Sequence, residues 1–260
     1  MPLSLPTTTV EAPTTARGRD LRRRERHFLH PRGAEPAPDL TYPDSDGQPM
    51  ADNTLQFEWI VTIKSGLEAL FSHRDDVFVA GDLLWYPVQG RPDLRRAPDA
   101  LVAFGRPRGY RGSYRQWEEG GIAPQVVFEV LSPGNRLMEM ARKFEFYDEY
   151  GVEEYYLYDP EEGVLLGWQR VDGMLRVIEP MQGWVSPHLG IRFELVEGEL
   201  QLLRPDGERF LTYLELLQQR DQEHAARLKA EQQAQRLAAK LREMGVDPDT
   251  VLIAHEGGDA

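Results

Sequence analysis

The stretch QVVFEVLS, residues 125–132, places a carboxylate inside an apolar run, and this restricts the folds open to the chain. Apolar, β-favouring residues at this density predict a buried strand. Side chains alternate along a strand, so Glu129 shares one face with Val127 and Leu131. Burying a carboxylate costs several kcal/mol unless a cation, a metal ion or hydrogen bonds compensate it. The fold must therefore bring such a partner to Glu129.

The chain divides into four segments of different composition. Residues 1–45 are rich in Pro, Thr and charge and poor in large apolar side chains, which predicts a mostly disordered arm. Residues 46–213 carry helix and strand patterns and predict one folded domain. Residues 214–244 are rich in Gln, Arg, Glu, Ala and Leu, which predicts a solvated helix whose spacing permits a short coiled coil. Residues 245–260 are expected to form a flexible tail.

Apolar periodicity within the domain predicts an α/β fold. One helix is predicted over residues 54–72, with an apolar stripe that starts at Leu55, and another over residues 136–151, ended by Gly151. Apolar runs separated by Gly, Pro and Arg predict strands at residues 77–88, 98–105, 125–132, 153–160, 163–171 and 174–180. Residues 184–213 continue as hairpin-like β segments. This order predicts one central sheet with helices packed against it.

Composition argues against several classes of protein. The net charge of −13 disfavours a protein that coats nucleic acid without specificity, because phosphate affinity comes mainly from clustered Lys and Arg. Without cysteine, the chain forms neither disulfides nor a thiolate zinc site. The first residues lack the pattern of a signal peptide, and no apolar run is long enough to cross a membrane. A cytoplasmic protein without a membrane segment is therefore expected.

A second carboxylate and a lysine are candidate partners for Glu129. Asp99 comes directly before another predicted strand, so on a neighbouring strand it would lie at the same sheet edge. Two crowded carboxylates repel each other and favour a hard divalent cation, Mg²⁺ or Mn²⁺. Lys143, one of only four lysines, shares a helix side with Tyr147, and its ammonium is suited to contact a phosphate. Two alternatives stay open: Glu129 paired with an arginine, and Lys143 solvated at the surface.

Five segments in order along the chain are similar to a known family: APDALVAFG, GSYRQWEEG, VVFEVLSPGN, EMARKFEFY and GVEEYYLYDP. Over about residues 41–215 the chain resembles the Uma-type restriction endonuclease family, which belongs to the PD-(D/E)xK nuclease superfamily. The resemblance implies a restriction-endonuclease-like core, a central mixed sheet flanked by helices, to which the β-hairpins and the C-terminal helix are added. It also implies an endonuclease that hydrolyses phosphodiester bonds in DNA with the help of Mg²⁺ or Mn²⁺.

The resemblance assigns roles to individual residues. It implies that Asp99 and Glu129 are catalytic and hold the metal ion together with the backbone carbonyl of Val130. The superfamily carries a lysine two residues after the second acid, where this chain has Leu131, and the family pattern places the lysine at Lys143 instead. The further candidate site residues are Ser132, Tyr147, Glu58 and Asp82. For Asp82, a structural role in a turn is the alternative.

The segment RPRGYRGSYRQW, residues 106–117, alternates arginines with aromatic side chains, which suits phosphate pairing and base stacking. The predicted nucleic-acid contacts are Arg106, Arg108, Tyr110, Arg111, Tyr114 and Arg115. The alternative is a polar loop with a half-buried aromatic anchor. The expected partners are DNA or another nucleic acid and further copies of this chain, as a homo-oligomer and specifically a dimer. Two rival hypotheses stay open: a nuclease fold that binds without cleaving, and an interaction or scaffold protein.

Overall fold

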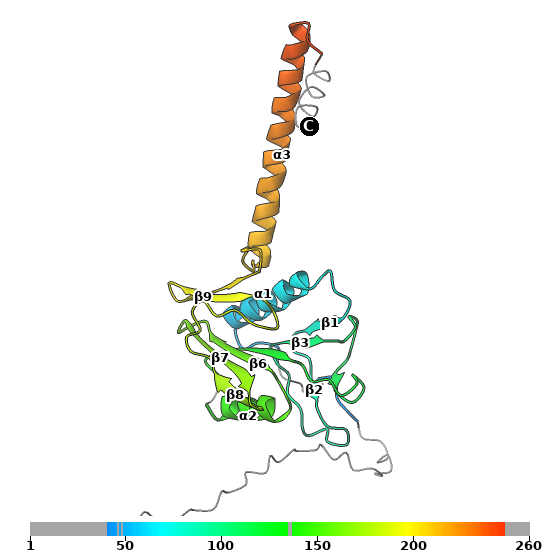
Figure 1. Ribbon diagram of the computed structural model, residues 1–260, viewed down its shortest axis with the longest axis vertical. Helices are drawn as coiled ribbons and strands as arrows, with labels where there is room; N and C mark the ends of the chain where they lie inside the picture. Colours follow the sequence, from blue (N-terminus) through cyan, green and yellow to red (C-terminus); the bar gives the residue numbers. More distant parts are fainter. Residues whose placement is uncertain (1–40, 46, 48, 135–136, 248–260) are drawn as a thin grey trace, which may run out of the picture. The chain divides into compact units, whose positions relative to one another are not determined.

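The chain folds around a six-stranded mixed sheet (Figure 1). The computed structural model describes residues 41–45, 47, 49–134 and 137–247, so most of the predicted arm and tail lies outside the described residues. In sheet order the strands are β1 (Val77–Ala80), β3 (Ala100–Phe104), β5 (Val126–Val130), β6 (Glu154–Asp159), β7 (Val164–Val171) and β8 (Met174–Val177). β5 and β6 pair in parallel, and every other neighbouring pair is antiparallel. The predicted α/β fold with a central mixed sheet is confirmed.

Helices cover both faces of this sheet. The remaining elements are α1 (Thr54–Leu70), β2 (Trp85–Tyr86), β4 (Tyr114–Arg115), α2 (Leu137–Glu149), β9 (Arg192–Val196), β10 (Glu199–Leu203) and α3 (Tyr213–Glu243). α1 and the β9–β10 hairpin pack on one face and α2 on the other (Figure 1). Phe128 contributes to the core under α1, and Val127 contributes to the core under α2. By the same alternation, Glu129 faces α2.

The apolar run at residues 77–88 forms two strands rather than one. Asp82 has a positive φ of 48°, so the chain bends after β1. β2 then leaves the central sheet and pairs in parallel with β4. An uninterrupted strand was predicted because the run is apolar on both sides of this bend.

α1 buries most of the predicted stripe, but Leu55 at its start lies outside the core. Its N-cap is Asn53, whose side chain accepts a hydrogen bond from the Gln56 amide. The buried stripe runs through Gln56, Ile60, Ile63 and Leu67, whereas Leu55 is 37% exposed. The rest of the predicted stripe packs in or against the core, and Gln56 rather than Leu55 begins the buried face. As a result, a glutamine faces the sheet.

α2 is tied to the sheet at its C-terminal end. The Arg170 guanidinium on β7 donates to the carbonyls of Tyr147 and Asp148, over 3.2 and 2.8 Å. The Asp148 side chain in turn accepts a hydrogen bond of 2.7 Å from the Leu175 amide of β8. These contacts satisfy carbonyls that a helix end leaves without partners. They also fix which α2 side chains lie over β5.

α3 confirms the predicted C-terminal helix. It begins with a capping box, in which Thr212 and Glu215 exchange hydrogen bonds between side chain and backbone. None of its residues is buried. The coiled coil and the homo-oligomer stay predictions. No helix in the described part of the chain is long and apolar enough to cross a membrane.

Truncation after Gln218 is expected to leave the melting temperature nearly unchanged. The removed residues are not buried, and the capping box at Thr212 and Glu215 is retained. Circular dichroism measures the melting temperature, and light scattering of both proteins shows whether the helix carries the predicted dimer. Recovery of the truncated protein only as aggregate would contradict the prediction, because the helix would then complete the core.

Candidate active site

Asp99 and Glu129 meet at one edge of the central sheet. β3 and β5 are antiparallel neighbours, and their register pairs Ala100 with Phe128. One residue further, the same register sets Asp99 opposite Glu129. Both side chains are buried. The structure thus brings together the two acids that the sequence singled out.

Two side chains of α2 compensate the charge of Glu129, which is only 2% exposed. The Lys143 ammonium donates to one carboxylate oxygen over 2.7 Å, and the Tyr147 hydroxyl donates to the other. These two residues are four positions apart and therefore lie on the same side of the helix. Among the described residues, Lys143 rather than an arginine forms the ion pair with Glu129.

Asp99 is held at this edge by the backbone of β5. Its Oδ2 accepts a hydrogen bond of 2.6 Å from the Val130 amide. Burial, followed by the charge of Glu129, raises the pKa of Asp99 well above its ordinary value, although Lys143 acts in the opposite direction. The two acids repel each other, so the pair favours uptake of a proton or a cation.

The same surroundings shift the pKa values of the two α2 side chains. Burial lowers the pKa of Lys143, but the charges of Glu129 and Asp99 outweigh it, and the net shift is upward. Burial and the charge of Glu129 raise the pKa of Tyr147 well above its ordinary value. Lys143 is therefore a cation at neutral pH, while Tyr147 is a neutral donor. The Trp85 ring packs parallel to that of Tyr147, with centroids 6.4 Å apart.

Gln56 is a residue of the site that sequence reasoning missed. Its side-chain amide donates to the Val130 carbonyl, and its amide oxygen accepts from the Asp52 backbone, both over 2.8 Å. The Ser132 hydroxyl donates to the Asp52 carboxylate over 2.5 Å. The carbonyl predicted as a metal ligand thus already accepts one hydrogen bond and keeps one lone pair. A polar residue on the buried stripe of α1 was the signal for Gln56.

A cleft of about 1070 Å³ connects the site with solvent. Asp99 and Lys143 line it. Asp82 lines it as well, from the bend between β1 and β2. Glu58, in contrast, is exposed on α1 and does not belong to the cleft wall. The structure therefore does not bring Glu58 to the two acids.

The arginines of residues 106–117 are largely engaged within their own loop. Arg106 and Arg111 pair with Glu119, at 3.3 and 2.5 Å. Arg115 pairs with Glu118 at 3.4 Å. The first two pairs are mostly buried, so separating them to bind phosphate would leave Glu119 without compensation.

The aromatic side chains of this loop differ in exposure. Tyr110 is 96% exposed. Tyr114 is fully buried, and its hydroxyl donates to the Ile122 carbonyl over 2.8 Å. The nucleic-acid contact predicted at Tyr114 is wrong, because a buried ring is not accessible to a base. Tyr114 is the aromatic anchor of the alternative interpretation.

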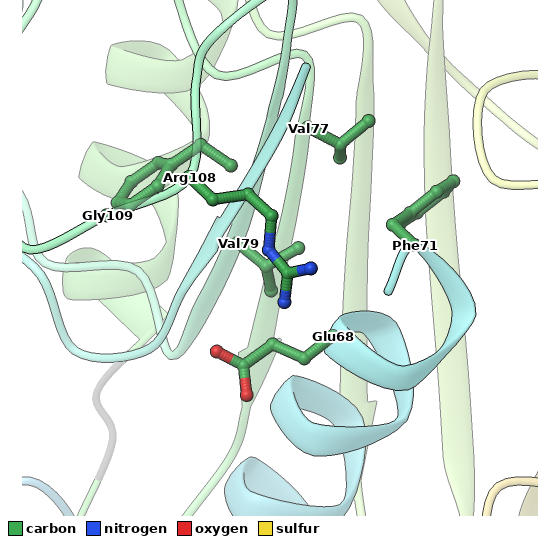
Figure 2. A pocket seen from close by; sticks show the side chains of 7 residues that line it. Glu68, Phe71, Val77, Val79, Arg108 and Gly109 are labelled. Carbon is green, nitrogen blue, oxygen red and sulfur yellow. The ribbon is translucent and has the colours of Figure 1, made fainter. Parts of the chain in front are cut away.

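A second cavity, of about 230 Å³, lies between α1 and β1 (Figure 2). Figure 2 shows the side chains of Glu68 and Arg108 pointing toward one another across it. Arg108 also donates to the Ser72 carbonyl over 2.9 Å. Neither Asp99 nor Lys143 lines this cavity, so it is separate from the candidate site.

The donor atoms of the site fit a hard cation that keeps part of its water. Mg²⁺ is commonly bound through one or two carboxylates plus waters and substrate phosphates. Asp99 and Glu129 offer two carboxylates, each with lone pairs beyond those already used. No cluster of three or more acidic or histidine side chains able to hold a metal occurs in the described residues. The two carboxylates are therefore of the chemical type that a hard divalent cation binds.

Comparison with known proteins gives the family. The family model Uma2, described as "Putative restriction endonuclease", matches residues 63–195, slightly more than half of the 260-residue chain. The chain belongs to the Uma2 family. The match includes Asp99, Glu129 and Lys143, and it confirms the resemblance drawn from the sequence motifs.

Among solved structures, the chain is similar to "a putative nuclease belonging to DUF820 from Anabaena variabilis ATCC 29413". The two chains are 14% identical with a TM-score of 0.40, over 53% of this chain and 75% of the other. A search of curated proteins found no match.

Asp99→Asn is expected to raise the free energy of unfolding at about pH 8 in EDTA and to change it little at about pH 4. Because its pKa is raised in the folded protein, the carboxyl binds its proton more tightly there than in the unfolded chain. Wild-type stability therefore falls as the pH rises from the ordinary Asp pKa toward the raised value, and the variant lacks this loss. Urea denaturation at both pH values measures the difference.

Asp75→Asn is the matched control, since Asp75 is exposed. Because this variant keeps Asp99, its stability should fall with rising pH as that of the wild type does, and its difference from the wild type should be the same at both pH values. If Asp99→Asn instead lost equal stability at both pH values, the hydrogen bond from Val130 would outweigh the repulsion between the acids.

Proposed function

We propose that this member of the Uma2 family is a divalent-metal-dependent endonuclease that hydrolyses phosphodiester bonds in DNA. The observation that carries the proposal is the meeting of Asp99, Glu129 and Lys143 beside one cleft. The two acids can bind a divalent cation, and the ammonium held next to them can contact a phosphate. Membership of a family described as restriction endonucleases supports a nuclease.

In this proposal Asp99 and Glu129 hold Mg²⁺ or Mn²⁺, which supplies Lewis-acid charge for a phosphate and an attacking water. The chain's other groups orient these two ligands. The Val130 amide fixes Asp99, and the Tyr147 hydroxyl fixes one oxygen of Glu129. Ligands held by such contacts need little rearrangement when they act.

Lys143 serves both the acids and the substrate. Its ammonium has three donors, of which one is used by Glu129. Its side chain is 15% exposed and lines the cleft, so the remaining N–H groups can reach a phosphate there. A compact ammonium fits this place better than a guanidinium, which spreads its charge over a plane.

Asp99→Asn and Glu129→Gln are each expected to abolish Mn²⁺ binding in isothermal titration calorimetry. Each variant removes one of the two anionic ligands and leaves a neutral side chain of similar shape. Glu58→Gln is the control, because Glu58 is an exposed acid away from the cleft. Undiminished Mn²⁺ binding by both site variants would overturn the metal assignment.

Lys143→Ala is expected to slow cleavage of supercoiled plasmid DNA in saturating Mg²⁺ by roughly a hundredfold or more, as when one preorganised charge-stabilising group is lost. Lys64→Ala is the control, since Lys64 is the other lysine of the domain and pairs with Glu68 on α1. Circular dichroism must show that Lys143→Ala is folded, because its removal leaves Glu129 buried without a cation.

Adding Leu131→Lys to the Lys143→Ala variant tests whether the two positions reach the same point, and partial recovery of cleavage is expected. A Lys143→Ala protein that cuts as fast as the wild type would make this lysine structural only. A wild-type protein that binds Mn²⁺ and DNA without cleaving would support the nuclease fold that has lost catalysis.

A further inference from the structure

We propose that Arg95, Arg96 and Arg142 form the surface that binds the phosphodiester backbone of the substrate. All three line the same cleft as Asp99 and Lys143. The inference rests on the proposed function, and it places the substrate on a different surface from the arginine-rich segment 106–117. Neither the family description nor the sequence motifs pointed to these three residues.

The guanidinium groups of these arginines are available for a ligand. Within the described part of the chain, none of the three forms an ion pair. Arg95 donates to the Pro92 carbonyl and Arg96 to the Arg95 carbonyl, each over 2.7 Å. A guanidinium has five N–H donors, so both keep free donors for the paired oxygens of a phosphate. Arg142 is exposed on α2.

The position of Arg142 links this surface to the acids. It precedes Lys143 on α2, and both side chains line the cleft. Arg96 approaches the same helix from the segment before Asp99, and its guanidinium lies 5.4 Å from the centre of the Phe146 ring. Positively charged side chains therefore come from two chain segments, the one before Asp99 and α2. A nucleic-acid strand held by them would lie over Asp99.

The cleft is also lined by acidic side chains, Asp52, Asp82, Asp93, Asp99 and Glu139, and three of these are engaged with other groups. Asp93 pairs with Arg91 over 2.6 Å. Asp52 accepts a hydrogen bond from Ser132, and Asp99 accepts one from the Val130 amide. Glu139 adds negative charge near Lys143, but in the described part of the chain the three arginines form no ion pair with an acid. The net charge of −13 thus coexists with a local surface suited to an anionic backbone.

The loop arginines serve as a contrast. Arg106 and Arg111 are committed to Glu119, and Arg108 belongs to the second cavity. Phosphate contacts by engaged, partly buried arginines would first require breaking those pairs. The arginine-rich segment 106–117 and the arginines that line the cleft are therefore different parts of this molecule.

The test is the salt dependence of binding to a fluorescein-labelled DNA duplex and to the single strand of the same sequence. Fluorescence anisotropy is measured in EDTA between about 50 and 200 mM salt, where phosphate contacts change affinity steeply. Arg95→Ala and Arg142→Ala should each weaken binding and lower the slope of log K against log salt by about one. The double variant should lower the slope by about two, and Arg95→Lys and Arg142→Lys should largely preserve it.

Arg176→Ala is the matched control, because Arg176 is an exposed arginine on β8 that does not line the cleft. It should leave the slope unchanged. An unaltered slope in the Arg95→Ala and Arg142→Ala double variant, or no DNA binding by the wild type, would overturn the proposal. Arginine-dependent binding without cleavage in Mg²⁺ would leave this surface standing and overturn the proposed hydrolysis instead.

Discussion

The compensation of Glu129 is the interaction on which the rest of the site depends. A carboxylate that is 2% exposed inside a sheet would cost several kcal/mol without partners, and both partners come from one helix. Lys143 and Tyr147 reach the two oxygens of Glu129 only if α2 packs on the sheet in one particular position, which is called its register here. Arg170 holds that register at the C-terminal end of the helix, through the carbonyls of Tyr147 and Asp148. One charge on β5 therefore determines where α2 lies, and α2 forms a wall of the cleft.

A second buried glutamate shows that burial alone does not make a site. Glu154 on β6 is fully buried and accepts hydrogen bonds from the hydroxyls of Tyr156 and Ser186 and from the His188 amide. These neutral donors satisfy its charge and tie the segment before β9 to the sheet, so its role is structural. Glu129 differs because its partner is a lysine on a cleft wall and its neighbour is a second acid.

The contrast also shows what sequence can and cannot predict here. Most elements of the central sheet follow from local periodicity and were predicted, and Asp99 was expected near Glu129 if their strands were neighbours, which they are. Glu129 and Glu154 both lie in apolar strands, however, and they differ only through partners that are distant in sequence. Gln56 was missed because glutamine is ordinarily exposed, and its burial depends on the Val130 carbonyl, which is distant in sequence. Tyr114 was misassigned because its burial depends on the pairing of β2 with β4. Strands of two residues are too short to show an alternating apolar pattern in the sequence.

Leu131 stands where the superfamily carries its lysine, and packing explains why an apolar residue suits this position. Leu131 shares a strand face with Glu129 and packs, like Met140 and Phe144, against the apolar cluster under α2. A lysine there would give up the apolar contacts of Leu131, whereas Lys143 places its ammonium at the cleft without losing them. The proposed chemistry requires that the lysine ammonium lie beside the two acids. It does not require a fixed number of residues between the lysine and the acids along the chain. The superfamily's spacing finds the two acids without their lysine, the family pattern places the lysine at Lys143, and the packing of α2 on β5 brings it to Glu129.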